Sequence, residues 1–122
     1  MRPRLRLSIS EGTQVPVRSL TPREVMELQS KPGAALKLLD VREPWEYERV
    51  HLPDCQHIPM DELRERLAEL DPQQTYVVLC HHGNRSQQVA AFLQARGFSQ
   101  VINLAGGIEA WATELAPQMA RY

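Results

Sequence analysis

Along the chain, short hydrophobic runs alternate with stretches in which apolar residues recur at helical spacing. The clearest runs cover 36–41, 76–80 and 101–104. Their short length and their content of Val, Ile and Leu predict buried strands of a parallel sheet. A very short further strand is predicted at His57-Ile58-Pro59.

Between these runs the spacing of apolar residues predicts helices. Thr21-Pro22-Arg23-Glu24 is a capping box with Pro at the first helical position, which predicts a helix to about Gln29. Three further helices are predicted, one that Asp61 caps, one from Ser86 to Arg96, and one after the turn at Gly106-Gly107. Their apolar faces would carry Leu63, Leu67 and Leu70; Val89, Phe92 and Leu93; and Ile108, Trp111 and Leu115.

Strands that alternate with helices predict a single α/β domain with a parallel sheet. We place this domain at 13–118, with an N-terminal extension at 1–12 and a C-terminal tail at 119–122. The connection 42–51 should be ordered, because its aromatic side chains need packing partners. The aromatic residues expected in the core are Trp45, Phe92 and Trp111.

Composition and charge exclude several classes of function. The 122 residues are 43% hydrophobic, which is enough for one core. With 14 basic and 15 acidic residues the net charge is -1, so no global field attracts nucleic acid or an anionic membrane. Two cysteines make no disulfide framework, and no secretory signal or 18-residue apolar span is seen, so we expect a cytoplasmic protein without membrane or nucleic-acid partners.

The strongest chemical signal is Cys80, at the carboxyl end of the predicted strand 76–80. The loop His81-His82-Gly83-Asn84-Arg85 then leads directly into a helix. Gly83 lets the backbone bend so that several N–H groups face one point, and the helix N-terminus and Arg85 add positive potential. The sequence therefore predicts an anion cradle that favours the thiolate form of Cys80. A buried cysteine can also serve simply as a small apolar residue.

Other polar residues have structural readings beside the functional ones. His81 and His82 could tune the loop or donate a proton, or could be exposed side chains only; adjacent residues seldom point at one metal, so no metal site is expected. Asp40 and Arg42 could contact the rim of the site or tie a strand end to the loop below, with Glu46 as a partner for Arg42. Cys55 is predicted to pack rather than to resolve a disulfide.

Three separated motifs show a resemblance to a known family. Cys80-x-x-Gly83-x-Arg85-Ser86 resembles the active-site loop of rhodanese-family sulfurtransferases. The segment 40–47, with His51-Leu52-Pro53 and Ile58-Pro59 after it, is similar to the family's upstream signature, and Gly106-Gly107-Ile108 with Trp111 is similar to its closing segment. The resemblance implies a three-layer α/β fold, with a central, mostly parallel sheet of about five strands and helices on both faces.

The resemblance also implies a function. Cys80 would carry sulfur as a persulfide from a donor such as thiosulfate or another persulfide to an acceptor, namely cyanide, a thiol or a protein thiol, without a cofactor. His81, His82, Gly83, Asn84, Arg85 and Ser86 would form the substrate-binding loop. Two alternatives remain, a non-catalytic binding or regulatory module and a cysteine-dependent phosphatase or arsenate reductase. Four residues separate Cys80 from Arg85, whereas phosphatase loops of this kind have five.

Overall fold

A computed structural model describes residues 16–122. Five strands form one parallel sheet in the order β1-β5-β4-β2-β3. The strands are β1 (Arg18–Leu20), β2 (Leu36–Asp40), β3 (Cys55–His57), β4 (Thr75–Leu79) and β5 (Val101–Leu104). The α-helices are α1 (Pro22–Ser30), α2 (Pro44–Arg49), α3 (Asn84–Ala95) and α4 (Gly107–Leu115), and the short 3-10 helices are η2 (Met60–Glu62) and η3 (Leu67–Glu69).

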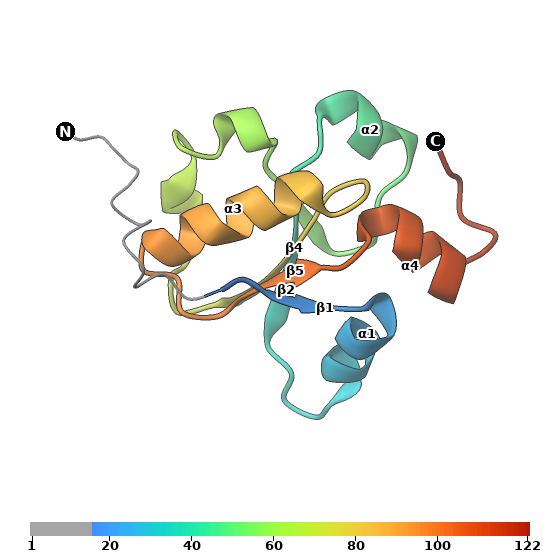
Figure 1. Cartoon of the computed structure of the whole chain (residues 1–122), viewed down its shortest axis with the longest axis horizontal. Helices are drawn as coiled ribbons and strands as arrows, with labels where there is room; N and C mark the ends of the chain where they lie inside the picture. The colour runs from blue at the N-terminus through green and yellow to red at the C-terminus, as the bar shows by residue number, and fades with distance from the viewer. Residues whose placement is uncertain (1–15) are drawn as a thin grey trace.

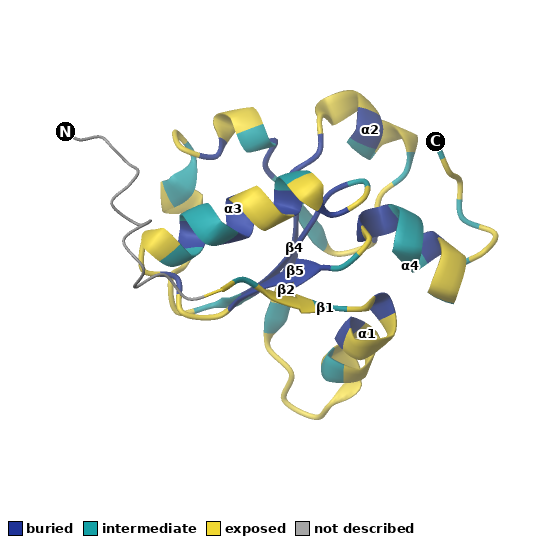
Figure 2. Ribbon diagram, in the orientation of Figure 1, coloured by how far each residue is buried: buried dark blue, intermediate teal, exposed yellow. Residues whose placement is uncertain are grey.

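Helices cover both faces of the sheet, so the fold has three layers (Figure 1). On one face α3 packs with the segment 60–70 over alternate side chains of β2, β4 and β5. On the other face α1 and α4 lie side by side and cover the remaining side chains of the same strands. The central strands are buried on both sides, as Figure 2 shows, which explains their nearly continuous apolar runs.

The predicted fold class is confirmed, and most of the predicted elements are observed. The capping box at Thr21 starts α1, and the strand predicted at 101–104 is β5. The edge strand β1 was missed, since its three residues are mostly polar and exposed and therefore show no hydrophobic pattern. The predicted extension 1–12 lies outside the described residues. Among residues 16–122, no helix combines the length and the apolar character that crossing a bilayer requires.

The helix predicted from Asp61 is wrong. The segment instead forms η2 and η3, which are joined by turns, and Pro59 rather than Asp61 lies at the start of η2. Leu63 and Leu70 are buried as the pattern predicts. Forming the first turn of an α-helix costs free energy, and a stretch of about ten residues is too short to recover much of it. Because buried leucines already anchor this segment, short turns with i to i+3 hydrogen bonds are enough to satisfy its backbone.

The connection 42–51 contains a helix that was not predicted, and its tryptophan is not in the core. Six residues of α2 are too few to show a hydrophobic period, and Glu43 is not a typical N-terminal cap. The backbone N–H of Glu43 donates to the Glu46 carboxylate at 2.9 Å and so closes the first turn. Trp45 is 59% exposed, because α2 turns Glu46 inward and Trp45 outward.

Candidate functional site

Cys80 follows β4 at the carboxyl edge of the sheet, where its side chain is only 1% exposed. Its Sγ atom accepts hydrogen bonds from the backbone N–H groups of Gly83, at 3.1 Å, and Ser86, at 3.3 Å. Two amides therefore converge on the sulfur from the loop predicted to hold it. Such donors favour an anionic sulfur over a neutral one.

The N-terminus of α3 supplies one of these donors. Gly83 stands at the cap position of α3 with a φ of 106°, a left-handed conformation that glycine adopts without strain. It has no side chain to satisfy the unpaired N–H groups of the first turn. The sulfur of Cys80 caps this turn instead, because it accepts a hydrogen bond from the backbone N–H of Ser86, the third helical residue. Negative charge on the sulfur would thus lie at the positive end of a 12-residue helix.

A buried hydrogen-bond chain continues from the sulfur into the sheet. The Ser86 hydroxyl lies 3.3 Å from Sγ of Cys80 and 2.5 Å from Oδ1 of Asn103, which accepts from it. The side chain of Asn103 donates in turn to the hydroxyl of Ser19 at 3.2 Å. Asn103 was not predicted as a site residue, although one polar residue in the apolar run 101–104 is a usable signal.

The first turn of α4 holds the outer side of the loop. The backbone N–H groups of Ile108 and Glu109 donate to the carbonyls of Cys80, at 2.9 Å, and His81, at 3.1 Å. In a trans peptide the C=O and the next N–H point in opposite directions, so these bonds turn the N–H groups of His81 and His82 away from α4. The glycine pair at 106–107 therefore forms a turn and also brings the N–H groups that follow it against the reactive loop.

Arg85, at the second position of α3, forms a two-point ion pair with a glutamate of α2. Its two terminal nitrogens donate to Oε1 and Oε2 of Glu46 at 2.7 and 2.9 Å. Burial alone would raise the pKa of Glu46, but hydrogen bonds from Arg85, the Glu43 amide and Tyr122 outweigh it and hold that pKa at about 2. The pKa of Arg85 is raised, chiefly by its hydrogen bonds to Glu46. Among residues 16–122, the other three guanidinium N–H groups of Arg85 have no hydrogen-bond partner.

Tyr122 also contacts this ion pair, and it lies in the segment 119–122 that was predicted to be a C-terminal tail. Its hydroxyl lies 2.9 Å from Oε2 of Glu46 and 2.8 Å from a terminal nitrogen of Arg42. Its ring stacks on that of His81, with the centroids 3.9 Å apart. No motif in the sequence pointed to Tyr122, because a residue near the end of the chain can be placed only by the path of the segment before it.

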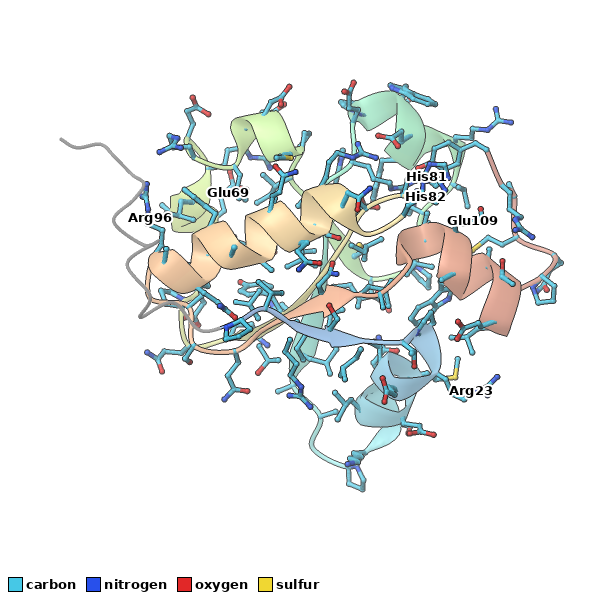
Figure 3. The ribbon with its side chains drawn as sticks, in the orientation of Figure 1. Arg23, Glu69, His81, His82, Arg96 and Glu109 are labelled. Atoms are coloured by element: carbon cyan, nitrogen blue, oxygen red, sulfur yellow. The ribbon has the colours of Figure 1, made fainter. Side chains whose placement is uncertain are left out.

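The two loop histidines differ in their surroundings. The ring of His81 lies between the rings of Tyr122 and His82, and its Nε2 atom is buried without a hydrogen-bond partner among the described residues. Burial lowers the pKa of His81, and the neighbouring His82 lowers it further, so both favour the neutral ring. His82 is exposed, as is Asn84 at the start of α3. Figure 3 shows both histidines close to the N-terminal end of α4, near Glu109.

Asp40 and Arg42 form a fully buried ion pair at the end of β2. The Arg42 guanidinium lies 2.7 Å from the Asp40 carboxylate, and both side chains are 0% exposed. Of the two expected roles of Arg42, this burial fits the structural tie at the strand end and not a contact at the rim of the site. Glu46 is a partner of Arg42, as expected, but through its backbone carbonyl, which accepts from Arg42 at 3.2 Å, while the Glu46 carboxylate turns to Arg85.

Cys55 lies on the edge strand β3, and burial raises the pKa of its thiol to about 12. Among residues 16–122, no three His, Cys, Asp or Glu side chains gather as a metal site. A cavity of about 110 Å³ lies beside Arg85, where Glu43, Asp61 and Glu62 make it acidic. A larger cavity of about 240 Å³ lies along α3, next to Met60 and Phe92.

Comparisons with known proteins agree with this architecture. The family description "Rhodanese-like domain" matches residues 21–114. The thiosulfate sulfurtransferase GlpE of Pseudomonas syringae is 39% identical over 92 residues, which cover 75% of this chain and 85% of GlpE. The crystal structure of a rhodanese-related protein from Thermoplasma volcanium is 35% identical and superposes with a TM-score of 0.73, covering 82% of this chain and 95% of that one.

A cysteine in an amide loop at the carboxyl edge of a five-stranded parallel sheet, together with these matches, defines the class of the protein. The chain belongs to the rhodanese-like family. Relatives of the chain that bear the name sulfurtransferase include GlpE. The probable adenylyltransferase/sulfurtransferase MoeZ of Mycobacterium tuberculosis is 39% identical over 106 residues, 85% of this chain, but this chain spans only 27% of the length of MoeZ.

Proposed function

We propose that the protein is a sulfurtransferase that carries sulfur as a persulfide on Cys80. The observation that carries this proposal is the pair of N–H groups, from Gly83 and Ser86, that converge on Sγ of Cys80 at the N-terminus of α3. These fixed donors stabilise a thiolate before the reaction and a persulfide anion after it. The family membership and the similarity to GlpE support the same chemistry.

The reaction has two steps. The Cys80 thiolate attacks the outer sulfur of thiosulfate, a sulfur–sulfur bond forms on Cys80, and the bond to the sulfonyl sulfur breaks, which releases sulfite with the electron pair. An acceptor such as cyanide or a thiolate then attacks the outer sulfur of the persulfide and leaves the Cys80 thiolate behind. A persulfide donor would load Cys80 in the same way and release a thiolate.

Within this scheme the loop residues have separate roles. The amides of Gly83 and Ser86 hold the reacting sulfur, and the free N–H groups of Arg85 bind the oxygens of thiosulfate and of the departing sulfite. Because Glu46 already neutralises much of the charge of Arg85, the amides and the helix N-terminus contribute most of the stabilisation. Asp40 and Arg42 fix the neighbouring strand end and do not touch the substrate.

The test is a mass measurement on reduced protein after incubation with thiosulfate and removal of the donor. We expect a gain of one sulfur atom in the wild type and in Cys55→Ser, and none in Cys80→Ser. Cys55 is the matched control because it is the other cysteine of the chain. No gain in any form, while Cys80 still reacts with an alkylating agent, would leave the binding module as the better function. Release of phosphate from an aryl phosphate that is lost in Cys80→Ser would favour the phosphatase instead.

A further inference from the structure

We propose that Tyr122 is a positioning residue of the Cys80 site, which acts through Glu46 on Arg85. This inference rests on the proposed function where it concerns thiosulfate, and on the geometry alone where it concerns the placement of Arg85. Its starting point is the segment 116–122, which follows α4 and turns back so that the end of the chain lies near α2 (Figure 1). The ring of Tyr122 there stacks on His81 of the reactive loop.

The direction of each hydrogen bond at the Tyr122 hydroxyl is unambiguous. A guanidinium can only donate and a carboxylate can only accept, so the hydroxyl accepts from Arg42, at 2.8 Å, and donates to Oε2 of Glu46, at 2.9 Å. Burial raises the pKa of Tyr122 to about 12, so the hydroxyl keeps its proton over the whole working range of pH. Tyr122 thus links the buried ion pair at Asp40 to the ion pair of Arg85.

This link determines how firmly Glu46 holds Arg85. Each oxygen of Glu46 accepts from one nitrogen of Arg85 and from one further donor, which is the Glu43 amide for Oε1 and the Tyr122 hydroxyl for Oε2. Without the hydroxyl, Oε2 loses its second donor, and Arg42 is left with a free N–H that attracts the carboxylate. The carboxylate can then turn away from Arg85, whose side chain is 33% exposed and has room to move into solvent.

The Tyr122 ring reinforces the position of the hydroxyl. It stacks on His81 with an interplanar angle of 12°, and the exposed Trp45 packs edge-on against it with the centroids 5.7 Å apart. Arg121, the residue before it, pairs with Glu109 of α4. The segment is therefore fastened at two neighbouring points, one on α4 and one on the reactive loop, and the hydroxyl is placed with little freedom.

The experiment compares Tyr122→Phe, which removes the hydroxyl, with Tyr122→Leu, which removes the ring as well. The matched control is Tyr47→Phe, since within the described part of the chain the Tyr47 hydroxyl donates only to the Cys55 carbonyl, at 3.4 Å. We expect Tyr122→Phe to raise the KM for thiosulfate roughly three- to tenfold, as for loss of one ordinary hydrogen bond, with kcat within about twofold. Tyr122→Leu should raise KM at least as much, and Tyr47→Phe should leave it unchanged.

A second readout does not depend on sulfur transfer. In a Cys55→Ser background, the ratio of alkylation rates of Cys80 by anionic iodoacetate and neutral iodoacetamide reports the positive potential that Arg85 places at the sulfur. We expect this ratio to fall roughly threefold in Tyr122→Phe and to stay unchanged in Tyr47→Phe. If wild-type protein takes no sulfur from thiosulfate, the proposed transfer from thiosulfate fails, while this ratio still tests the placement of Arg85 by Tyr122.

Three outcomes would overturn the inference. The first is an unchanged KM and alkylation ratio in Tyr122→Phe. The second is a defect in Tyr122→Leu alone, which would show that only the packing of the ring matters. The third is an equal change in Tyr47→Phe, which would reflect a general loosening of the fold, and unfolding midpoints measured on all three variants would reveal it.

Discussion

Glu46 and Arg85 stand 39 residues apart in the sequence, and their side chains meet in two hydrogen bonds of 2.7 and 2.9 Å. The pair ties α2 to the first turn of α3, directly beside the loop that holds the sulfur. It also cancels most of the charge of the one arginine that the reactive loop carries. The loop therefore depends on oriented amides and a helix N-terminus rather than on a free cation.

Replacing Glu46 by Gln should destabilise the protein. The carboxylate is buried and accepts from Arg85, Glu43 and Tyr122, and an amide can accept with only one of its two polar atoms. We expect a loss of about 3 kcal/mol in the free energy of unfolding at pH 7, measured by urea denaturation. Glu48→Gln is the matched control on the same helix, because Glu48 is exposed. An equal stability of Glu46→Gln and wild type would contradict the role given to this ion pair.

The same carboxylate predicts how stability depends on pH. The pKa of Glu46 is about 2 in the folded protein, below its ordinary value of 4.5. The folded state therefore stays ionised at pH values where the unfolded chain takes up a proton, so this contribution is fully present above about pH 4.5 and is lost as pH falls toward 2. The difference corresponds to about 3 kcal/mol. Unfolding midpoints between pH 6 and 2.5 should fall more steeply in wild type than in Glu46→Gln, and parallel curves would refute the assignment.

Gly107 should tolerate no side chain. Its φ is 64°, and a Cβ atom placed on it would lie 2.5 Å from the carbonyl oxygen of Cys80. Gly107→Ala should cost at least about 3 kcal/mol of stability, from backbone strain together with the displaced loop, and should also slow persulfide formation. Gly97→Ala separates the two effects, because Gly97 has a φ of 93° with nothing within 4 Å of its Cβ position. The Gly97→Ala variant should lose about 1 to 2 kcal/mol in the free energy of unfolding and keep its activity. An equal loss of stability in both variants would argue against a steric role of Gly107.

Removing the buried cation of Arg42 should have a large effect on folding. Arg42→Met leaves the Asp40 carboxylate buried without its partner, which should cost about 3 to 5 kcal/mol by thermal or urea unfolding. Arg66→Met provides the comparison, since Arg66 also pairs with carboxylates but at the surface, where solvent screens the charges. Its unfolding midpoint should change little. Similar effects of the two substitutions would mean that burial does not set the strength of the Asp40–Arg42 pair.

The sequence predicts those parts of the structure accurately that depend on neighbouring residues. The strand 101–104 and the capping box at Thr21 were predicted because period and cap residues are read within a few positions. The position of Cys80 at the end of a strand and before a helix likewise follows from neighbouring residues. The helix from Asp61 failed for the opposite reason, because the buried leucines at 63 and 70 are compatible with several local conformations and tertiary packing chose among them.

By itself, the sequence determined the α/β class, the order of the main strands and helices, and the loop that carries the reactive cysteine, because these depend on hydrophobic period, caps and short motifs. Only the tertiary structure decided which charges meet: Asp40 pairs with Arg42, and Glu46 turns to Arg85. It also brought Asn103 and Tyr122 to the site, from β5 and from beyond α4. The physical reason is that an ion pair or a stacked ring depends on distance in space, and residues 39 or 76 positions apart come within 3 Å only when the sheet is assembled.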